Sequence, residues 1–296
     1  MKIGITGASG FIGSHLITIA RARGHECVAF SRPPGNPVRG CVETRRFSTN
    51  GDMDLSNLDA IVHLAGESVV GVWTRAKKRR IYASRVAGTR SLVQSMRCCA
   101  DPPRVLISGS ATGYYGDTAD RIVDESAEPG ANFLSTVCVA WESEANQASE
   151  LGIRVVKLRT GMVLGADGGA LPLMKTPFKL GLGAELGDGD QWMAWIHVRD
   201  EAALILHAAE NESVEGPLNA VSPNPVQNGT FTTALADALG RPAIFRVPAP
   251  ILRIVLGGFS VELLESFRVV PARALHSGFA FQFRELEDAL EDLLNS

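Results

Sequence analysis

A glycine-rich turn after a short apolar run constrains the fold of this chain more than any other feature. Residues Lys2 to Thr6 have the character of a buried strand, and they lead directly into Thr6-Gly7-Ala8-Ser9-Gly10-Phe11-Ile12-Gly13. An amphipathic segment from Phe11 to Arg23 follows and ends at Gly24. Strand, glycine turn and helix in this order are typical of a βαβ unit whose turn binds the diphosphate of a dinucleotide.

Each glycine of this turn has its own steric task. Gly7 permits the tight turn from strand to helix, Gly10 lets backbone amides approach a diphosphate, and Gly13 lets the helix pack closely on the sheet. The diphosphate is expected at the positive N-terminal end of the helix. An accidental glycine turn is the competing interpretation. The residues predicted to bind the dinucleotide here are Gly7, Gly10, Phe11, Ile12 and Gly13.

The first half of the chain alternates strand-like and helix-like runs, which is the pattern of a parallel sheet covered by helices. The predicted fold class is therefore α/β, a Rossmann-type doubly wound parallel sheet. The expected strands are Lys2 to Thr6, Cys27 to Phe30, Ala60 to Leu64, Arg104 to Ser108 and Arg154 to Leu158, with a short one near Thr44 to Phe47. The expected helices are Phe11 to Arg23, about Thr74 to Cys99 and about Phe133 to Leu151.

Beyond Gly165 the chain is rich in glycine, which is typical of long surface loops that carry substrate sites. We expect residues 1–165 to form the dinucleotide-binding domain, with segments near 193–225 returning to it, and residues 166–296 to form a smaller C-terminal α/β substrate domain. The elements expected here are a strand from Met193 to Val198, a helix from Glu201 to Glu210 capped by Asp200, and helices from Thr230 to Leu239 and Arg284 to Leu294.

Composition excludes several classes of protein. The net charge of −3 over 296 residues argues against nucleic-acid binding, which usually requires a strong basic excess. The five cysteines have no CxxC spacing, so neither a metal site nor a disulfide framework is predicted, and a reducing cytoplasm fits. The longest apolar stretch, Ala249 to Val261, is too short to cross a membrane.

The end of the second expected strand indicates which nicotinamide coenzyme fits. In such folds an acidic residue there hydrogen-bonds the ribose 2′-hydroxyl of NAD. Here the strand runs into Ser31 and Arg32, with no acid before Glu43. Ser31 can donate a hydrogen bond to a 2′-phosphate and Arg32 can pair with it through its guanidinium, so NADP(H) is predicted. A solvent-exposed Arg32 without a ligand is the alternative.

Several motifs together resemble the extended short-chain dehydrogenase/reductase family. The resemblance implies that Leu64, Ala65 and Gly66 lie against the coenzyme, that the substrate is a small molecule, and that dimerisation through paired helices is common. The motifs are the glycine turn, His63-Leu64-Ala65-Gly66, Val86-Ala87-Gly88-Thr89, Ser108-Gly109-Ser110-Ala111-Thr112-Gly113-Tyr114-Tyr115-Gly116 and Trp195-Ile196-His197-Val198-Arg199-Asp200.

More narrowly, residues 1–294 resemble the atypical "epimerase family" branch of that family, whose members are often labelled nucleoside-diphosphate-sugar epimerases and carry a C-terminal domain of unknown function. The motifs that carry this narrower resemblance are Leu64-Ala65-Gly66-Glu67, Ser84-Arg85, Val137-Cys138-Val139-Ala140-Trp141-Glu142, Arg159-Thr160-Gly161-Met162-Val163-Leu164-Gly165 and Pro177-Phe178-Lys179-Leu180-Gly181-Leu182-Gly183.

The chain departs from the wider family at its proton-transfer device. Active members use a Tyr and a Lys four residues later, the Lys lowering the pKa of the phenol. This chain has three tyrosines, Tyr82, Tyr114 and Tyr115, and no lysine follows any of them at that spacing. The usual Tyr-x-x-x-Lys pair is therefore missing.

Other residues are candidates for the chemistry. By resemblance, Ser110 corresponds to the serine that assists the family tyrosine, with Thr112 a close second; plain backbone capping is the alternative. Tyr115 is a candidate proton donor, and Cys138 is either a titrating thiol or an inert buried cysteine. Arg85, on the helix beside the coenzyme cleft, is expected to reach a phosphate or the substrate; a surface role is the alternative.

Two hypotheses of different classes follow. The first is an NADP(H)-dependent oxidoreductase or epimerase-like enzyme acting on a small carbonyl or sugar-like compound, with reduction favoured. The second is a catalytically inactive NADP(H)-binding sensor or scaffold, which the missing Tyr-x-x-x-Lys pair favours. A hydrolase fits less well because the sequence has no G-x-S-x-G turn.

Overall fold

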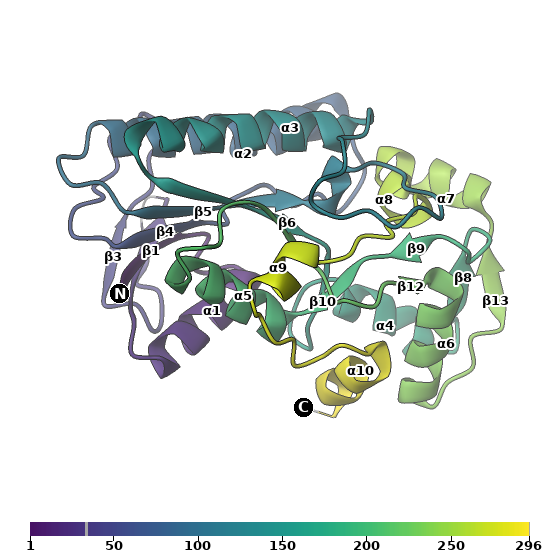
Figure 1. Cartoon of the computed structure of the whole chain (residues 1–296). Helices are drawn as coiled ribbons and strands as arrows, with labels where there is room; N and C mark the ends of the chain where they lie inside the picture. Colours follow the sequence, from purple (N-terminus) through teal and green to yellow (C-terminus); the bar gives the residue numbers. More distant parts are fainter. Residues whose placement is uncertain (33–34, 296) are drawn as a thin grey trace.

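A parallel β-sheet forms the centre of the molecule (Figure 1). The computed structural model describes residues 1–32 and 35–295. Within them the seven strands of the sheet have the order β11-β6-β5-β4-β1-β2-β3, and every neighbouring pair is parallel. The strand order reverses between β1 and β4, where ligands bind in sheets of this kind. The strands are β1 (Lys2–Thr6), β2 (Glu26–Ser31), β3 (Glu43–Arg46), β4 (Ala60–His63), β5 (Val105–Ala111), β6 (Arg154–Thr160) and β11 (Gly216–Ala220).

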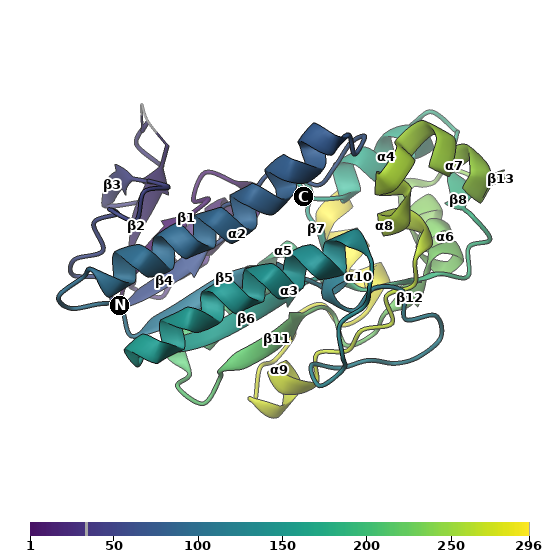
Figure 2. The same cartoon turned by 90° about the horizontal axis from the view of Figure 1, so that it is seen from above.

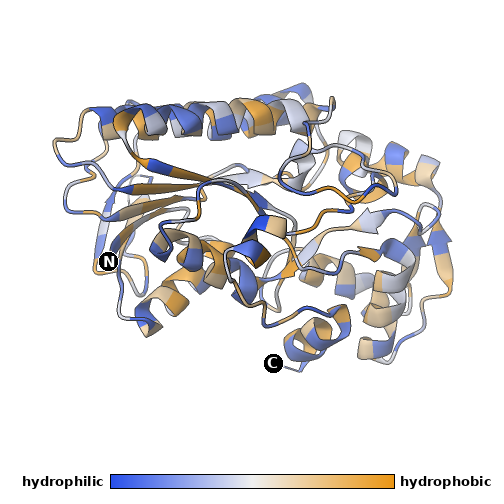
Figure 3. Ribbon diagram, in the orientation of Figure 1, coloured by the Kyte–Doolittle hydropathy of each residue, from blue (hydrophilic) through white to orange (hydrophobic). Residues whose placement is uncertain are grey.

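Helices cover both faces of the sheet. α1 and α5 pack together on one face, and α2 and α3 pack together on the other (Figure 1). The strands between them are largely apolar (Figure 3) and contribute to two buried clusters, one on each face. These layers confirm the predicted α/β class and doubly wound sheet. The four helices are α1 (Phe11–Ala22), α2 (Arg75–Arg97), α3 (Phe133–Asn146) and α5 (Val198–Glu210).

Two expected elements differ in detail. The strand expected from Met193 to Val198 is broken at Ala194, and its halves pair with different partners, β9 with β12 and β10 with β7. Helix α5 begins at Val198, not Glu201, and its cap is His197, whose Nδ1 accepts a hydrogen bond from the Arg199 backbone at 3.0 Å. The short strands are β7 (Met162–Leu164), β9 (Trp192–Met193), β10 (Trp195–His197) and β12 (Val226–Gln227).

Asp200 has a different task from the capping role expected of it. Its carboxylate accepts hydrogen bonds from the backbone amides of Gln282 and Phe283, at 2.9 and 2.8 Å. Asp200 therefore attaches the C-terminal segment to the first turn of α5. A side chain whose partners lie more than eighty residues away carries no local signal that distinguishes it from a helix cap.

Most of the remaining elements gather at one end of the sheet, whereas α9 lies along the outer strand β11 (Figure 2). α9 packs beside β11, and α10 packs on α6 with Leu286, Leu290 and Leu293 buried. No helix in the described residues is long and apolar enough to cross a membrane. The elements are α4 (Leu171–Lys179), β8 (Ala184–Leu186), α6 (Asn228–Leu239), β13 (Phe245–Val247), α7 (Ala249–Leu256), α8 (Val261–Leu264), α9 (Ala272–His276) and α10 (Leu286–Leu294).

Candidate active site

The glycine bend between β1 and α1 is built by close backbone contacts. Gly7 has a φ of +74°, and its carbonyl accepts a hydrogen bond from the Gly10 amide at 2.9 Å. A Cβ added at Gly13 would lie 2.4 Å from the Gly7 oxygen, so no larger residue fits there without a backbone shift. The bend therefore leaves the start of α1 open to an anionic group, which suits the diphosphate of a dinucleotide.

The two apolar residues of the bend pack inward with their side chains. The Phe11 ring lies against Gly165 and Gly168, where an added Cβ would come within 2.3 and 2.4 Å of ring atoms. Ile12 packs against the buried cluster on the α1 face. Both side chains are therefore engaged within the protein. What remains available to a coenzyme is the backbone of these two residues at the first turn of α1.

The segment after β4 lies against the bend. The Leu64 backbone is 3.0 Å from the place of a Cβ on Gly7, and the Ala65 amide donates to Thr6 Oγ1 at 3.2 Å. A Cβ added at Gly66 would lie 3.4 Å from the Arg85 guanidinium carbon, so Arg85 lies close to this segment. The structure thus brings this segment, the bend and Arg85 together at the carboxyl end of the sheet.

Arg32 lies exposed at the carboxyl end of β2, one residue beyond the partly buried Ser31. Within the described part of the chain, no hydrogen bond or ion pair engages the Arg32 guanidinium. The next acid after it in the sequence, Glu43, is held by Arg45 through two hydrogen bonds of 2.9 and 3.0 Å. At the carboxyl end of β2, the Arg32 guanidinium is therefore available to a ligand, whereas the Glu43 carboxylate is already paired.

Ser110 belongs to a buried polar network at the end of β5. Its hydroxyl donates to Glu142 Oε1 at 2.7 Å, and Arg159 donates to both oxygens of the same carboxylate at 2.9 and 3.0 Å. Arg159 is 3% exposed and Glu142 is 7% exposed. A bidentate pair this deeply buried fixes α3 against β6 and holds the Ser110 hydroxyl in place.

Tyr115 is part of the same network. Its hydroxyl donates to Asn219 Oδ1 at 2.6 Å and accepts from Arg159 Nη1 at 2.9 Å. The ring of Tyr114 lies 3.4 Å from the Arg159 guanidinium carbon. Burial raises the pKa of Tyr115 to about 12 despite the nearby arginine, which keeps the phenol neutral. Because both hydrogen bonds of its hydroxyl are made within the network, Tyr115 stabilises the network and is not free to donate a proton.

Cys138 and Trp141 project from α3 toward the same end of the sheet. Burial raises the pKa of the Cys138 thiol to about 12, and its Sγ lies 3.8 Å from the Ala111 carbonyl oxygen. Trp141 packs over Gly109 of β5, and its ring centroid is 5.2 Å from the Arg85 guanidinium. These contacts favour the interpretation of Cys138 as an inert buried cysteine. Thr112 is buried at the start of a short 3-10 turn (Thr112–Tyr114) that directly follows β5.

Glu262, on α8, is a candidate that the sequence analysis missed. Its Oε1 is buried without a hydrogen-bond partner among the described residues, and burial raises its pKa to about 7. The Arg85 guanidinium is near enough to oppose that rise. The one sequence signal is an acid between two apolar residues, Val261 and Leu263, and that signal does not reveal what the carboxyl faces.

The basic run at the start of α2 is partly engaged within the protein. Lys77 and Arg80 both donate to Glu67 Oε1, at 2.9 and 3.3 Å. Lys78 lies 4.9 Å from the Phe133 ring centroid. These contacts stabilise the loop after β4 that carries Glu67.

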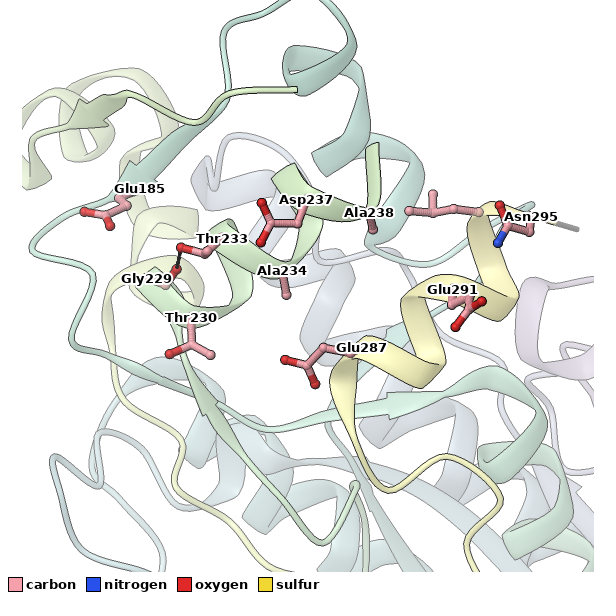
Figure 4. Close-up of a pocket in the computed structure, with 11 residues that line it drawn as sticks. Glu185, Gly229, Thr230, Thr233, Ala234, Asp237, Ala238, Glu287, Glu291 and Asn295 are labelled. Carbon is pink, nitrogen blue, oxygen red and sulfur yellow. Dashed lines mark hydrogen bonds between the residues drawn. The ribbon is translucent and has the colours of Figure 1, made fainter. Parts of the chain in front are cut away.

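A cavity of about 630 Å³ lies away from this site, between α6 and α10 (Figure 4). Its lining includes the acids Glu185, Asp237, Glu287 and Glu291. Such a lining repels an anionic nucleotide, so the cavity is a poor match for the predicted coenzyme. A second cavity, of about 450 Å³, borders Tyr115 and is also lined by Asn132 and Glu265.

The family model for "NAD dependent epimerase/dehydratase family" matches residues 3–220, which include the bend, Arg85 and the Ser110 network. The chain belongs to this family. A second model, for a domain of unknown function, matches residues 247–293. The combination of the two models confirms the resemblance that the sequence motifs indicate. Glu262 lies in the segment that matches the domain of unknown function.

Relatives of similar length share this arrangement. The epimerase family protein YfhF of Bacillus subtilis is 35% identical over 298 residues, covering 99% of this chain and 98% of its own. The crystal structure of human epimerase family protein SDR39U1 (isoform 2) with NADPH matches with a TM-score of 0.91 at 32% identity, covering 100% of both chains. A UDP-glucose 4-epimerase from Thermotoga maritima, at 18% identity, shares the fold with a TM-score of 0.79 over 100% of this chain and 98% of its own.

Proposed function

We propose that the chain is an NADP(H)-binding oxidoreductase or epimerase-like enzyme that acts on a small carbonyl or sugar-like compound, with carbonyl reduction favoured. One observation carries the proposal: the bend from Gly7 to Gly13 lies on the same sheet edge as the available Arg32. The bend suits a diphosphate, and Arg32 suits the additional phosphate that distinguishes NADP(H) from NAD(H). The human relative crystallised with NADPH supports this choice.

The residues present fit such a coenzyme. Glycines at the bend keep clear the space that a Cβ would fill, and the start of α1 presents backbone amides to a diphosphate. When bound, the nicotinamide supplies or accepts a hydride. The residues proposed to hold the coenzyme are Gly7, Gly10, Phe11, Ile12, Gly13, Ser31, Arg32, Leu64, Ala65, Gly66 and Arg85.

Ser110 is the proposed hydrogen-bond donor to the substrate oxygen. Glu142 and Arg159 hold the serine at the carboxyl end of β5, and its hydroxyl can rotate from Glu142 toward an incoming oxygen. Thr112, two residues later, is the second candidate. Tyr115 enters the proposal as an anchor, because both hydrogen-bonding directions of its hydroxyl are already used.

We also propose the division of labour along the chain. Residues 1–165, joined by β11 at the edge of the sheet, hold the coenzyme, and residues 166–296 supply most of the substrate side. The pairing of β11 with β6 supports the return of the later segment to the sheet. Truncation after residue 220 is expected to leave coenzyme binding measurable while abolishing turnover.

Coenzyme titration followed by a substrate screen tests the proposal. NADPH fluorescence is expected to report binding, and NADPH oxidation is then measured with aldehydes, ketones and nucleotide sugars. Ser110→Ala should lower kcat roughly 100-fold, as removal of an oxyanion donor does, without changing the NADPH affinity. Absence of binding by correctly folded protein contradicts the proposal.

A coenzyme-binding sensor without turnover is the second candidate. Two observations favour it: the missing Tyr-x-x-x-Lys pair, and the internal hydrogen bonds that already engage Ser110 and Tyr115. Tight NADPH binding combined with no turnover on the whole panel is the result expected for a sensor.

A further inference from the structure

The segment after α7 packs across the ends of α2 and α3, the two helices that cover one face of the sheet. Figure 2 shows α8 beside the ends of α2 and α3. The Phe259 ring lies 6.2 Å from the Trp73 ring, between centroids, and a Cβ added at Gly258 would lie 3.1 Å from Trp73. Phe259 packs against an apolar cluster that includes Ile81 of α2 and Leu134 of α3. The C-terminal part of the chain therefore packs against the starts of α2 and α3.

Three polar side chains lie one helical turn beyond that apolar cluster. Arg85 follows Ile81 by four residues on α2, Cys138 follows Leu134 by four on α3, and Glu262 follows Phe259 by three at the start of α8. Residues three or four apart share a helix face, so Arg85 and Cys138 lie beside their apolar neighbours. Electrostatic coupling of Arg85 with both Cys138 and Glu262 agrees with this placement.

Glu262 differs from two acids of the site already described, Glu67 on the loop after β4 and Glu142 on α3. Glu67 is paired with Lys77 and Arg80, and Glu142 is paired with Arg159. Glu262 has a buried Oε1 that no described residue contacts by a hydrogen bond. Buried polar atoms in native proteins normally have partners, so we take the orphan oxygen near Arg85 to indicate a partner that arrives with a ligand.

We propose that the carboxyl group of Glu262 is the proton donor to the substrate oxygen, taking the part that the missing Tyr-x-x-x-Lys pair plays in the wider family. This inference rests on the proposed function. The substrate class it implies is an aldehyde or ketone whose oxygen lies between Ser110 and Glu262. Glu262 is thereby a catalytic residue contributed by the C-terminal part of the chain.

The proton balance of the step is simple. The bound coenzyme supplies the hydride that the carbonyl carbon gains. The O–H bond of the Glu262 carboxyl breaks, a new O–H bond forms on the substrate oxygen, and an alcohol results. The carboxylate left on Glu262 faces the Arg85 guanidinium, which stabilises the negative charge until water returns a proton.

The groups around Glu262 suit this role. Arg85 faces it from α2 and favours the charged form, whereas Glu265, just beyond α8, favours the neutral form. Cys138 on α3 lies near Arg85 and is neutral, because burial raises its pKa. Burial dominates at Glu262, and a pKa of about 7 leaves both protonation states accessible at neutral pH.

The test uses the full-length protein, NADPH and the panel of aldehydes and ketones. Glu262→Gln should lower kcat roughly 100-fold or more at pH 6, while the NADPH dissociation constant stays within about twofold of wild type. Glu262→Asp keeps the carboxyl and should recover part of the activity, and it serves as the second variant if the glutamine form does not fold. Glu287→Gln, an exposed acid on α10, is the matched control and should behave as wild type.

A spectroscopic readout tests the same group without turnover. Difference infrared spectra of the wild type between pH 5 and 9 should contain a carboxylic acid band that disappears near pH 7 and is absent from Glu262→Gln, whereas the band of Glu201, lost near pH 8, should remain in both proteins. A wild type that turns over substrate while Glu262→Gln does so equally well overturns this inference alone. A wild type that binds NADPH but reduces no member of the panel overturns it together with the proposed enzymatic function.

Discussion

The proposed coenzyme end and the proposed substrate end of this molecule are built in opposite ways. At the coenzyme end, Gly7, Gly10 and Gly13 lie within seven residues, and their backbone contacts are set by local sterics. At the substrate end, Ser110 and Arg159 meet at one carboxylate from positions 49 residues apart in the sequence. Glu262 reaches the same end from the C-terminal part of the chain.

This difference teaches that the two ends are sensitive to different kinds of change. A bend made of backbone contacts fails when any side chain is added, because backbone atoms cannot give way. A network of buried charges fails when one member is removed, because the remaining charge is left without a partner. The predictions below use this contrast, from the largest expected effect to the smallest.

Arg159→Met should be the most destabilising change. It leaves the buried Glu142 carboxylate without its bidentate partner, which is expected to lower the free energy of unfolding by about 3–5 kcal/mol. Urea unfolding measures the effect. The control is Arg90→Met, which removes an exposed partner of Glu144 and should cost less than about 1 kcal/mol. Equal losses in the two variants would contradict the account of the substrate end.

Gly13→Ala should damage the coenzyme end. The added Cβ meets the Gly7 oxygen at 2.4 Å, and the shift it forces is expected to cost about 1–3 kcal/mol of stability and to abolish measurable NADPH binding. Gly229→Ala on α6 is the control, since its Cβ would meet nothing closer than 3.4 Å. Unaltered NADPH binding by Gly13→Ala would remove the steric argument for the bend.

Glu201→Gln should change how stability depends on pH. Burial raises the pKa of the Glu201 carboxyl to about 8, with one hydrogen bond from Thr160 Oγ1 at 2.8 Å opposing the rise. An acid whose folded pKa exceeds its unfolded value stabilises the fold below the unfolded pKa of about 4.5, and that stability declines as pH rises toward 8. The variant should therefore gain in Tm relative to wild type between pH 5 and 8. A constant Tm difference over this range would contradict the raised pKa.

Arg32→Gln should have the smallest effect, confined to coenzyme choice. Loss of one exposed charge-assisted pair is expected to raise the dissociation constant for NADPH about tenfold, which is about 1.4 kcal/mol, and to leave that for NADH unchanged. Fluorescence titration with both coenzymes measures the change, and Arg121→Gln, also exposed, is the control. A parallel loss for both coenzymes would show that Arg32 does not read the 2′-phosphate.

Periodicity and turn chemistry were sufficient to predict most of the central sheet. The strands from β1 to β6 and the helices α1, α2 and α3 lie where the sequence predicts them, within a few residues. β11 was expected only as a return to the sheet, because Gly216 and Pro217 disguise a strand whose partner is β6. The predicted cap of α5 was wrong because the hydrogen-bond partners of Asp200 lie in the C-terminal segment, far away in the sequence.

The sequence by itself determined the bend from Gly7 to Gly13, because the conformations that glycine permits are written into a few consecutive residues. The sequence also indicated Ser110 and Arg85 as candidate site residues. Tertiary structure alone decided what those side chains meet: Glu142 for Ser110, and Glu262 near Arg85. The physical reason is that burial and charge pairing depend on segments far apart in the chain, and these become neighbours only when the sheet and its cover of helices have formed.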